Sequence, residues 1–277
     1  MKVVVLCGDS PNQVTLVNLL HKEIGVHQLV IWRPFYSKKV NRIKDFGKPK
    51  RILLGLMNLP YRRAWFQMMH HYTKSFSGFP NVPTLTTADI NGEEVAAVIR
   101  SLENTLFIVS GTNLLKQPLL ELVQISSKVI NLHTGISPYV KGGPNCTNWC
   151  LANNQLSRIG NSVLWIDKGI DSGNLIATEQ TDIRGVTSLL ELHIRVMDHA
   201  HDLYMRVIKR VLSGQAVPSV TQKNFVEKNL FFTKDWSLKA RIKGLLNYLI
   251  RFKIRKNFST PNENLVLVNL NTPSGQL

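Results

Sequence analysis

The chain has 277 residues, 44% of them hydrophobic, and a formal net charge of +16, which indicates a globular protein with a sizeable core. No stretch approaches the about 20 apolar residues of a membrane-spanning helix, and the apolar run at 3–7 is too short for a signal peptide. We therefore expect a cytoplasmic protein made of one domain, or of one domain and an extension.

The positive charge is concentrated in two segments. Residues 32–63 hold ten Lys and Arg against one acidic residue, and residues 223–256 hold ten against two, so the rest of the chain is nearly neutral. Such clusters attract anions, and a nucleotide diphosphate, a tRNA backbone and an anionic membrane are all compatible with them.

The three cysteines, Cys7, Cys146 and Cys150, are odd in number and lack the spacing of a disulfide framework. We expect them to be reduced thiols in packing positions. Cys146 and Cys150 are one helical turn apart, but no further ligand stands nearby at a usual spacing, so we expect no metal site.

The first eighty residues begin with the alternation of an α/β fold and then depart from it. Residues 2–7 predict a buried strand, Ser10 is expected to cap a helix that begins at Pro11, and 26–32 predict a second strand. Residues 33–80 predict a basic insertion of one or two amphipathic helices. Such an insertion covers an acceptor site, lies on a membrane surface, or simply packs by its apolar face.

The α/β alternation resumes after the insertion. We predict a short strand at 82–85, a helix at 89–102, a strand at 105–109 and a helix at 115–126. The strand ends at Ser110-Gly111-Thr112, and a glycine at the carboxyl end of a parallel strand allows a ligand to approach the backbone closely.

Polar residues that carry chemistry follow the next two predicted strands. Asn131 and His133 come at the end of a short apolar run, and they are two positions apart, so their side chains share a face of the strand. A second run, 162–166, opens into a Gly-rich loop that carries Asp171. If the two strands are neighbours, an amide, an imidazole and a carboxylate converge at one edge of the sheet.

These three groups suit the attack of an amine on an acyl carbon. An amide N–H and a protonated imidazole both donate hydrogen bonds to the developing oxyanion, and a carboxylate favours the imidazolium and accepts a proton. By spacing alone, the alternative that Asn131 and His133 only satisfy a turn and that Asp171 is an ordinary loop residue stays open.

The pattern as a whole resembles the folate-dependent formyltransferases, which act on glycinamide ribonucleotide, methionyl-tRNA or sugar nucleotides. The resemblance depends on Asn131-x-His133, on Pro138 with Lys141-Gly142, and on Asp-x-Gly-x-Asp-x-Gly at 167–173. It covers about residues 1–214 and is strongest from 128 to 180.

The resemblance implies catalytic roles for Asn131, His133 and Asp171, with 10-formyltetrahydrofolate as the formyl donor and no metal. Many members have Ser-Leu-Leu-Pro where this chain has Gly135-Ile-Ser-Pro138. In the family that loop faces the acceptor, so this departure bears on the acceptor. The donor-binding residues that the resemblance implies are Gly111, Thr112, Asn113, Leu114, Leu115, Asp167, Gly169 and Ile170.

The remaining half of the chain predicts a helix at 145–153, a strand at 175–183 and a long helix opened by a Ser188–Glu191 capping box. After a strand at 229–232, a basic amphipathic helix begins at Asp235 or Ser237 and either docks on the catalytic domain or contacts phosphate or membrane. In the tail we expect fixed structure only near 265–270.

Together these features predict a Rossmann-like α/β fold with a mostly parallel, twisted sheet and helices on both faces. We divide the chain into a catalytic domain at 1–214, a basic extension at 215–257 and a tail at 258–277. Its expected activity is N-formyl transfer to a primary amine, with a nucleotide-linked amino-deoxy sugar for a surface glycan as the favoured acceptor. This acceptor is favoured because the predicted extension does not resemble the C-terminal β-barrel of the methionyl-tRNA enzymes.

Three alternatives to this expectation stay open. A methionyl-tRNA formyltransferase would use the same chemistry on a nucleic-acid partner, and a formyltetrahydrofolate hydrolase would use water as the acceptor. The third alternative is a non-catalytic module of the same fold whose basic surfaces bind an anionic polymer or contact a membrane peripherally.

Overall fold

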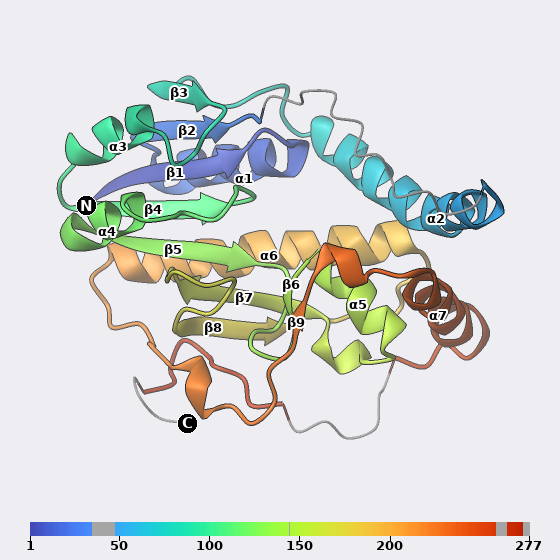
Figure 1. The fold of residues 1–277 in the computed structure, drawn as a ribbon. Helices are drawn as coiled ribbons and strands as arrows, with labels where there is room; N and C mark the ends of the chain where they lie inside the picture. The colour runs from blue at the N-terminus through green and yellow to red at the C-terminus, as the bar shows by residue number, and fades with distance from the viewer. Residues whose placement is uncertain (35–47, 144, 259–264, 274–277) are drawn as a thin grey trace.

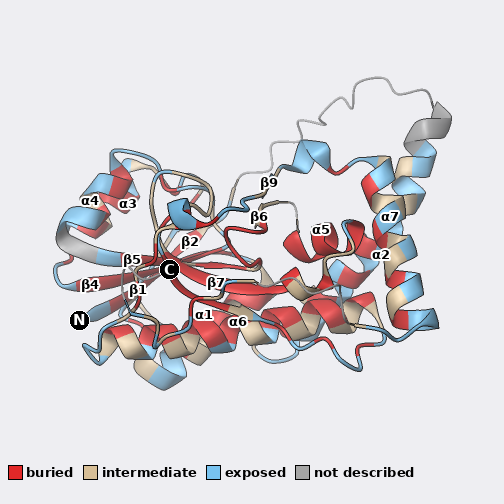
Figure 2. Cartoon of the chain, turned by 90° about the horizontal axis from the view of Figure 1, so that it is seen from below, coloured by how far each residue is buried: buried red, intermediate tan, exposed pale blue. Residues whose placement is uncertain are grey.

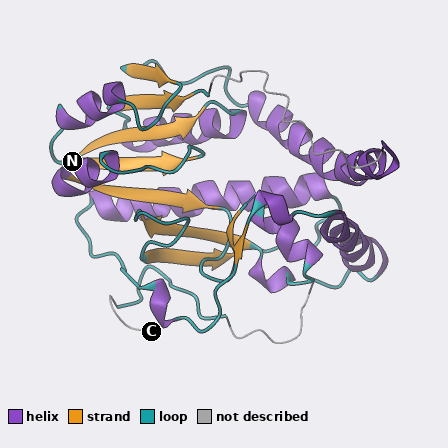
Figure 3. Ribbon diagram, in the orientation of Figure 1, coloured by secondary structure: helices purple, strands orange, loops and turns teal. Residues whose placement is uncertain are grey.

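A computed structural model describes residues 1–34, 48–143, 145–258 and 265–273 of the chain. Its main sheet has the order β3-β2-β1-β4-β5-β7-β8, in which the first five strands are parallel and β7 and β8 are antiparallel to their neighbours (Figure 3). The strands are β1 Lys2–Gly8, β2 Gln28–Trp32, β3 Thr84–Thr87, β4 Thr105–Ser110, β5 Ser127–His133, β7 Gly160–Trp165 and β8 Leu175–Gln180. The prediction of a mostly parallel α/β sheet is therefore confirmed.

Helices cover both faces of this sheet (Figure 1). The helices α1 Pro11–Ile24 and α6 Leu189–Leu212 pack on one face, and α3 Glu93–Arg100 and α4 Leu119–Ser126 pack on the other. The alternation of β1 explains both layers, because Val3 and Val5 point to the α1/α6 side while Val4 and Leu6 point to the α3/α4 side.

Three further helices gather at the carboxyl end of the parallel strands (Figure 1). They are α2 Lys48–Thr73, α5 Cys146–Ala152 and α7 Leu238–Tyr248, and the π-helical segment Leu249–Ile254 continues α7. Aromatic side chains join them: Trp236 packs edge-on against Tyr61 of α2 and Trp149 of α5, at centroid distances of 5.5 and 4.9 Å. The predicted insertion thus contains one long helix, and its residues 35–47 lie outside the described part of the chain.

Several predicted element ends are wrong because side chains hydrogen-bond nearby backbone first. A turn precedes α3, in which Asp89 Oδ1 accepts from the backbone N–H of Asn91, so the helix begins at Glu93 rather than at Asp89. The start of α4 moves to Leu119, because Asn91 Oδ1 binds the N–H of Lys116 at 2.6 Å. The expected strand at 82–85 lies two residues later, at Thr84–Thr87.

The three predicted N-caps have different outcomes. Ser188 Oγ accepts from the Glu191 N–H at 3.1 Å, and Ser237 Oγ accepts from the Ala240 N–H at 3.3 Å, so both are confirmed as caps. Ser10 occupies the N-cap position of α1, but its hydroxyl donates to Asn12 Oδ1 instead of accepting a helix N–H.

The C-terminal part of the chain contacts earlier segments, first through a small separate sheet and then through β8 of the main sheet. A two-stranded ladder joins β6 Lys141–Gly142 to β9 Leu230–Phe231. Farther on, the N–H of Val268 donates to Thr178 Oγ1 of β8 at 2.8 Å, as expected for a fixed segment near 265–270.

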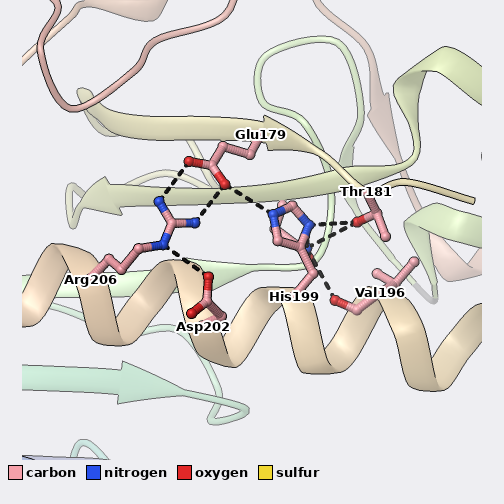
Figure 4. Close-up of polar contacts among 7 residues, drawn as sticks. Glu179, Thr181, Val196, His199, Asp202 and Arg206 are labelled. Carbon is pink, nitrogen blue, oxygen red and sulfur yellow. Dashed lines mark hydrogen bonds and ion pairs between the residues drawn. The ribbon is translucent and has the colours of Figure 1, made fainter.

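A polar network fastens α6 to β8 (Figure 4). Glu179 of β8 accepts from Arg206 of α6 at 2.6 and 2.9 Å, and it pairs with His199 at 3.0 Å. Hydrogen bonds to His199 and Arg206 lower the pKa of Glu179 to about 2 despite its partial burial. His199 thus helps to join α6 to β8, while His193 and His201 of the same helix are buried. The described residues contain no cluster of His, Cys, Asp and Glu fit for a metal.

Candidate active site

The carboxyl end of β5 places Asn131 and His133 on the same face of the strand. His133 is buried, and both of its ring nitrogens face acceptors: Nδ1 lies 3.3 Å from Asp171 Oδ2, and Nε2 lies 3.0 Å from the carbonyl oxygen of Val140. A ring with an acceptor at each nitrogen is stabilised in its doubly protonated form.

Opposing influences set the charge of this imidazole. Burial is the largest single influence and lowers the pKa of His133, but the Asp171 carboxylate, Cys146 and the Val140 carbonyl together raise it to about 10. Cys146 Sγ lies 3.5 Å from His133 Nε2, and burial raises the pKa of this thiol, so it stays neutral. Cys146, expected only as a packing residue, is thus a direct neighbour of the imidazole.

Asp171 reaches His133 by a route that differs from the expected one. β5 and β7 are neighbours, but they are antiparallel, so Ser162 pairs with His133 while Trp165, at the end of β7, pairs with Ile130. The loop after β7 therefore leaves the sheet away from His133, and it runs back along β5 to bring Asp171 to the imidazole. The side chains of Asn131, His133 and Asp171 therefore meet because this loop folds back, and not because two strands end side by side.

Three contacts hold the loop in this returned conformation. The N–H of Gly142 donates to Asp171 Oδ2 at 3.0 Å, and Gln222 Nε2 donates to the carbonyl oxygens of Asp171 and Gly173 at 2.8 Å each. Asp171 itself adopts a positive φ of 48°, which is unfavourable for a residue with a side chain. Gln222 lies beyond the predicted catalytic segment, and no sequence motif marks it.

Gly135 allows the protein to close around the imidazole. A Cβ at this position would lie 2.5 Å from His133 Nε2 and 2.6 Å from the carbonyl oxygen of Val140. Any other residue would push one of these groups away. This glycine belongs to the loop in which the chain departs from the Ser-Leu-Leu-Pro pattern.

A recess opens beside the three polar groups. Both Asn131 and Asp171 contribute to its wall, so the amide and the carboxylate face the same space. The lining residues are Val109, Thr112, Asn113, Leu114, Leu115, Asn131, Leu164, Ile166, Asp167, Gly169 and Asp171.

Six of the eight expected donor-binding residues are in this lining, and Gly111 and Ile170 are not. Gly111 has a φ of 69°, and a Cβ there would lie 2.8 Å from Nε2 of Gln13. The glycine therefore suits both this backbone conformation and the close packing against Gln13. The ligand contacts of all eight residues remain a prediction.

A second cavity lies on the other side of the first turn of α5. Cys146 of this turn contacts His133, while Asn145 and Asn148 line the cavity. Residues of α2, α6 and α7 complete the wall. The lining residues are Asn58, Tyr61, Arg62, Trp65, Phe66, Asn145, Asn148, His193, Thr233, Trp236 and Arg241.

The second cavity combines aromatic walls, two arginines and unused hydrogen-bonding atoms. Asn148 is buried, and its Oδ1 has no hydrogen-bond partner among the described residues; the same is true of Nε of Arg241. His193 is also buried, and burial lowers its pKa to about 4, so it is neutral at pH 7. Buried polar atoms without partners are costly in a free protein, which marks this wall as suited to a polar ligand.

Comparison with known proteins identifies a common family. The family model described as "Formyl transferase" matches residues 1–208. Among curated relatives, the methionyl-tRNA formyltransferase of Clostridium novyi is 28% identical over 113 residues, which is 41% of this chain and 35% of the relative. That of Finegoldia magna is 27% identical over 128 residues, 46% of this chain and 40% of the relative. The chain thus spans about a third to a half of the length of the curated relatives that it matches.

Solved structures share the fold over most of the chain. A 4-N formyltransferase from Francisella tularensis has a TM-score of 0.57 at 15% identity, covering 89% of this chain and 87% of that one. An N-formyltransferase from Helicobacter canadensis, in complex with folinic acid and dTDP-3-aminofucose, has a TM-score of 0.54 at 15% identity, covering 95% and 85%. At such identities the likeness extends to the fold.

Proposed function

Because the chain belongs to the formyl transferase family, we propose that it moves the formyl group of 10-formyltetrahydrofolate to a primary amine. One observation carries the proposal: Asn131 and Asp171 line a common recess, and Asp171 is paired with a buried His133. No helix of the described residues is long and apolar enough to cross a membrane.

In the proposed reaction, the lone pair of the acceptor amine attacks the formyl carbon and turns the carbonyl oxygen into an oxyanion. The amide of Asn131 donates a hydrogen bond to this oxygen, and the positive charge of His133 stabilises it. Asp171 accepts the proton that the amine releases, directly or through water. The bond from the formyl carbon to the folate nitrogen then breaks, and tetrahydrofolate leaves with a proton. One preorganised donor of this kind contributes about 3 kcal/mol to such a transition state.

The recess around Thr112 and Asp167 is the proposed site of the folate ring. Hydrogen bonds hold its loop together without a ligand, because Asp167 Oδ1 accepts from the N–H of Gly169 at 2.9 Å and from the hydroxyl of Ser172 at 2.5 Å. A preformed loop lowers the entropy cost of binding and orients the formyl carbon toward Asn131.

The proposed acceptor is a nucleotide-linked amino sugar, which would enter from the second cavity. Aromatic walls from Trp65 and Trp236 suit a nucleobase, and Arg62 and Arg241 suit a diphosphate. Asn148 Oδ1 supplies an acceptor for a hydroxyl or amine of the sugar. The Helicobacter canadensis structure, whose fold is similar, contains folinic acid and a dTDP-linked amino sugar, in support of this acceptor class.

Methionyl-tRNA is the second candidate acceptor, because the curated relatives carry that activity in their names. One assay distinguishes the two candidate acceptors. It measures tetrahydrofolate release with dTDP-, UDP- and GDP-linked amino sugars, with methionyl-tRNA, and with water alone. We expect turnover with one amino sugar and none in water. Turnover with tRNA would replace the acceptor, turnover in water alone would indicate a hydrolase, and no turnover with any acceptor would contradict formyl transfer.

A further inference from the structure

The helix α2 has a second apolar face that points away from the protein. Its inner face, with Tyr61, Ala64 and Met68, is buried. On the outer side, exposed apolar residues recur at the spacing i, i+4, i+7 and i+14, which places them on one stripe. The stripe consists of Ile52, Leu56, Leu59 and Phe66, the last of which also borders the second cavity.

The end of α7 and the π-helical segment after it repeat this feature. Leu246, Leu249, Ile250 and Ile254 are between 37% and 74% exposed. Of the 17 large hydrophobic side chains that are exposed in the described part of the chain, ten lie on α2 or on residues 246–254. The exposed apolar side chains are thus concentrated on these two elements. On most soluble proteins they are scattered singly over the surface.

The two elements form one continuous end of the molecule. The hydroxyl of Tyr61 donates to the carbonyl oxygen of Arg241 at 3.0 Å, and Arg241 Nη1 donates to the carbonyl oxygen of Leu54 at 3.1 Å. Figures 1 and 2 both show α2 and α7 side by side at this end, and Figure 2 shows their outer surfaces as exposed. We call the exposed apolar residues of α2 and 246–254, with the basic residues among them, the α2/α7 surface.

The charge of the α2/α7 surface selects among possible partners. Residues 48–73 and 238–256 contain no acidic residue, and they contain five and seven Lys and Arg. Arg63, Lys243 and Lys253 are exposed among the apolar side chains. A second copy of the chain would bring two such basic surfaces together, and a nucleic acid would use the basic residues but leave the aliphatic ones in water.

We propose that the α2/α7 surface docks on an anionic phospholipid bilayer. Its leucines and isoleucines enter the boundary between headgroups and acyl chains, and its lysines and arginines meet the lipid phosphates. The same helix contributes Asn58, Tyr61, Arg62, Trp65 and Phe66 to the wall of the second cavity, so docking brings that wall close to the membrane. The docking itself does not depend on the reaction proposed above.

Vesicle flotation of the full chain tests the proposal. We expect binding to phosphatidylcholine vesicles that contain phosphatidylglycerol, little binding to phosphatidylcholine alone, and release at high salt. The variants Leu56→Asp and Leu246→Asp should each bind the anionic vesicles about tenfold more weakly, because each removes one inserted side chain. Ile125→Asp is the matched control, since Ile125 is 85% exposed on α4, and it should bind like the wild type.

Three results would overturn the proposal. The first is equal binding to neutral and anionic vesicles, or no binding to either. The second is unchanged vesicle binding by both leucine variants while their melting temperatures match that of the wild type. The third is loss of another complex, either a dimer in light scattering or a complex with RNA, in both leucine variants while their vesicle binding persists. That result would assign the surface to the second copy or to RNA.

Discussion

The two cavities of the candidate site are built in different ways. The recess proposed for the folate, which we call the donor-side recess, is assembled from the ends of β4, β5 and β7 and from their loops, all between residues 109 and 171. The second cavity, which is proposed for the acceptor and which we call the acceptor-side cavity, draws on α2, α5, α6 and α7, and its lining residues extend from Asn58 to Arg241. The first lies wholly within the part of the chain that matches the family, and the second extends past its end at residue 208.

If the proposed function is right, this contrast separates the residues that act on the formyl group from those that select the acceptor. Groups that act on the formyl carbon need fixed positions, and the sheet supplies rigid strand ends for them. The groups proposed to select the acceptor can vary without disturbing the sheet, because helices at its carboxyl end hold them. Substitutions on the two sides should therefore have different kinetic signatures.

The largest effect is expected at the donor side. His133→Ala and Asp171→Asn should each lower kcat by about a hundredfold or more, because each removes charge stabilisation made in the transition state. The value of kcat is measured from the rate of tetrahydrofolate release at saturating concentrations of both substrates. Circular dichroism shows whether each variant is folded. Rates near that of the wild type in both variants would disprove the catalytic assignment.

A smaller loss of kcat, of about tenfold or more, is expected from Gly135→Ala. The new Cβ displaces either the His133 ring or the Val140 carbonyl, and a displaced catalytic group loses its alignment. Gly78→Ala is the matched control, since a Cβ at Gly78 meets no atom within 4 Å. Equal rates for both alanine variants would show that the contact with His133 is unimportant.

At the acceptor side, Asn148→Ala should act on KM instead of kcat. We expect the KM for the amino sugar to rise about tenfold, because a hydrogen bond to a buried acceptor is lost, while the KM for the folate stays constant. The melting temperature is measured in parallel. Since Asn148 Oδ1 has no partner in the described part of the free chain, a large loss of stability with an unchanged KM would point to a structural role.

The smallest effect concerns the alkaline limb of the pH profile. The pKa of His133 is raised to about 10, so its charge is intact at pH 7, and kcat/KM should fall to half its plateau near pH 10. Asn148→Ala should keep this limb, and a limb near pH 6.5 in the wild type would refute the ion pair with Asp171.

The same raised pKa adds to the free energy of unfolding. This contribution is complete below about pH 6.5 and is lost as the pH rises through about 10.

The sequence predicted the sheet and the catalytic residues for different reasons. Alternation and apolar runs identify strands such as β1 directly, since a buried strand must present hydrophobic residues. The motif identified Asn131, His133 and Asp171. It did not predict that the loop after β7 folds back to bring Asp171 to His133, because the antiparallel pairing of β7 with β5 depends on long-range contacts. The roles of these residues, like the division at 214 and 257, remain predictions.

The acceptor-side cavity could not have been predicted. Its residues follow no common spacing, and Trp236, Asn148 and His193 are indistinguishable in sequence from ordinary core residues. The residues that line it meet only because α2, α5, α6 and the segment that begins before α7 pack together. The same holds for Gln222 and Cys146, whose contacts with the Asp171 loop and with His133 arise from tertiary packing alone.

The most direct test of formyl transfer at this site uses 10-formyltetrahydrofolate with an isotopic label on the formyl carbon. The labelled donor and the amino sugar that supports turnover are incubated with the wild type or with Asp171→Asn, and the sugar is examined by mass spectrometry. We expect the label on the sugar amine with the wild type and almost none with the variant. Label that appears only as free formate, or equally with both proteins, would contradict amine formylation at this site.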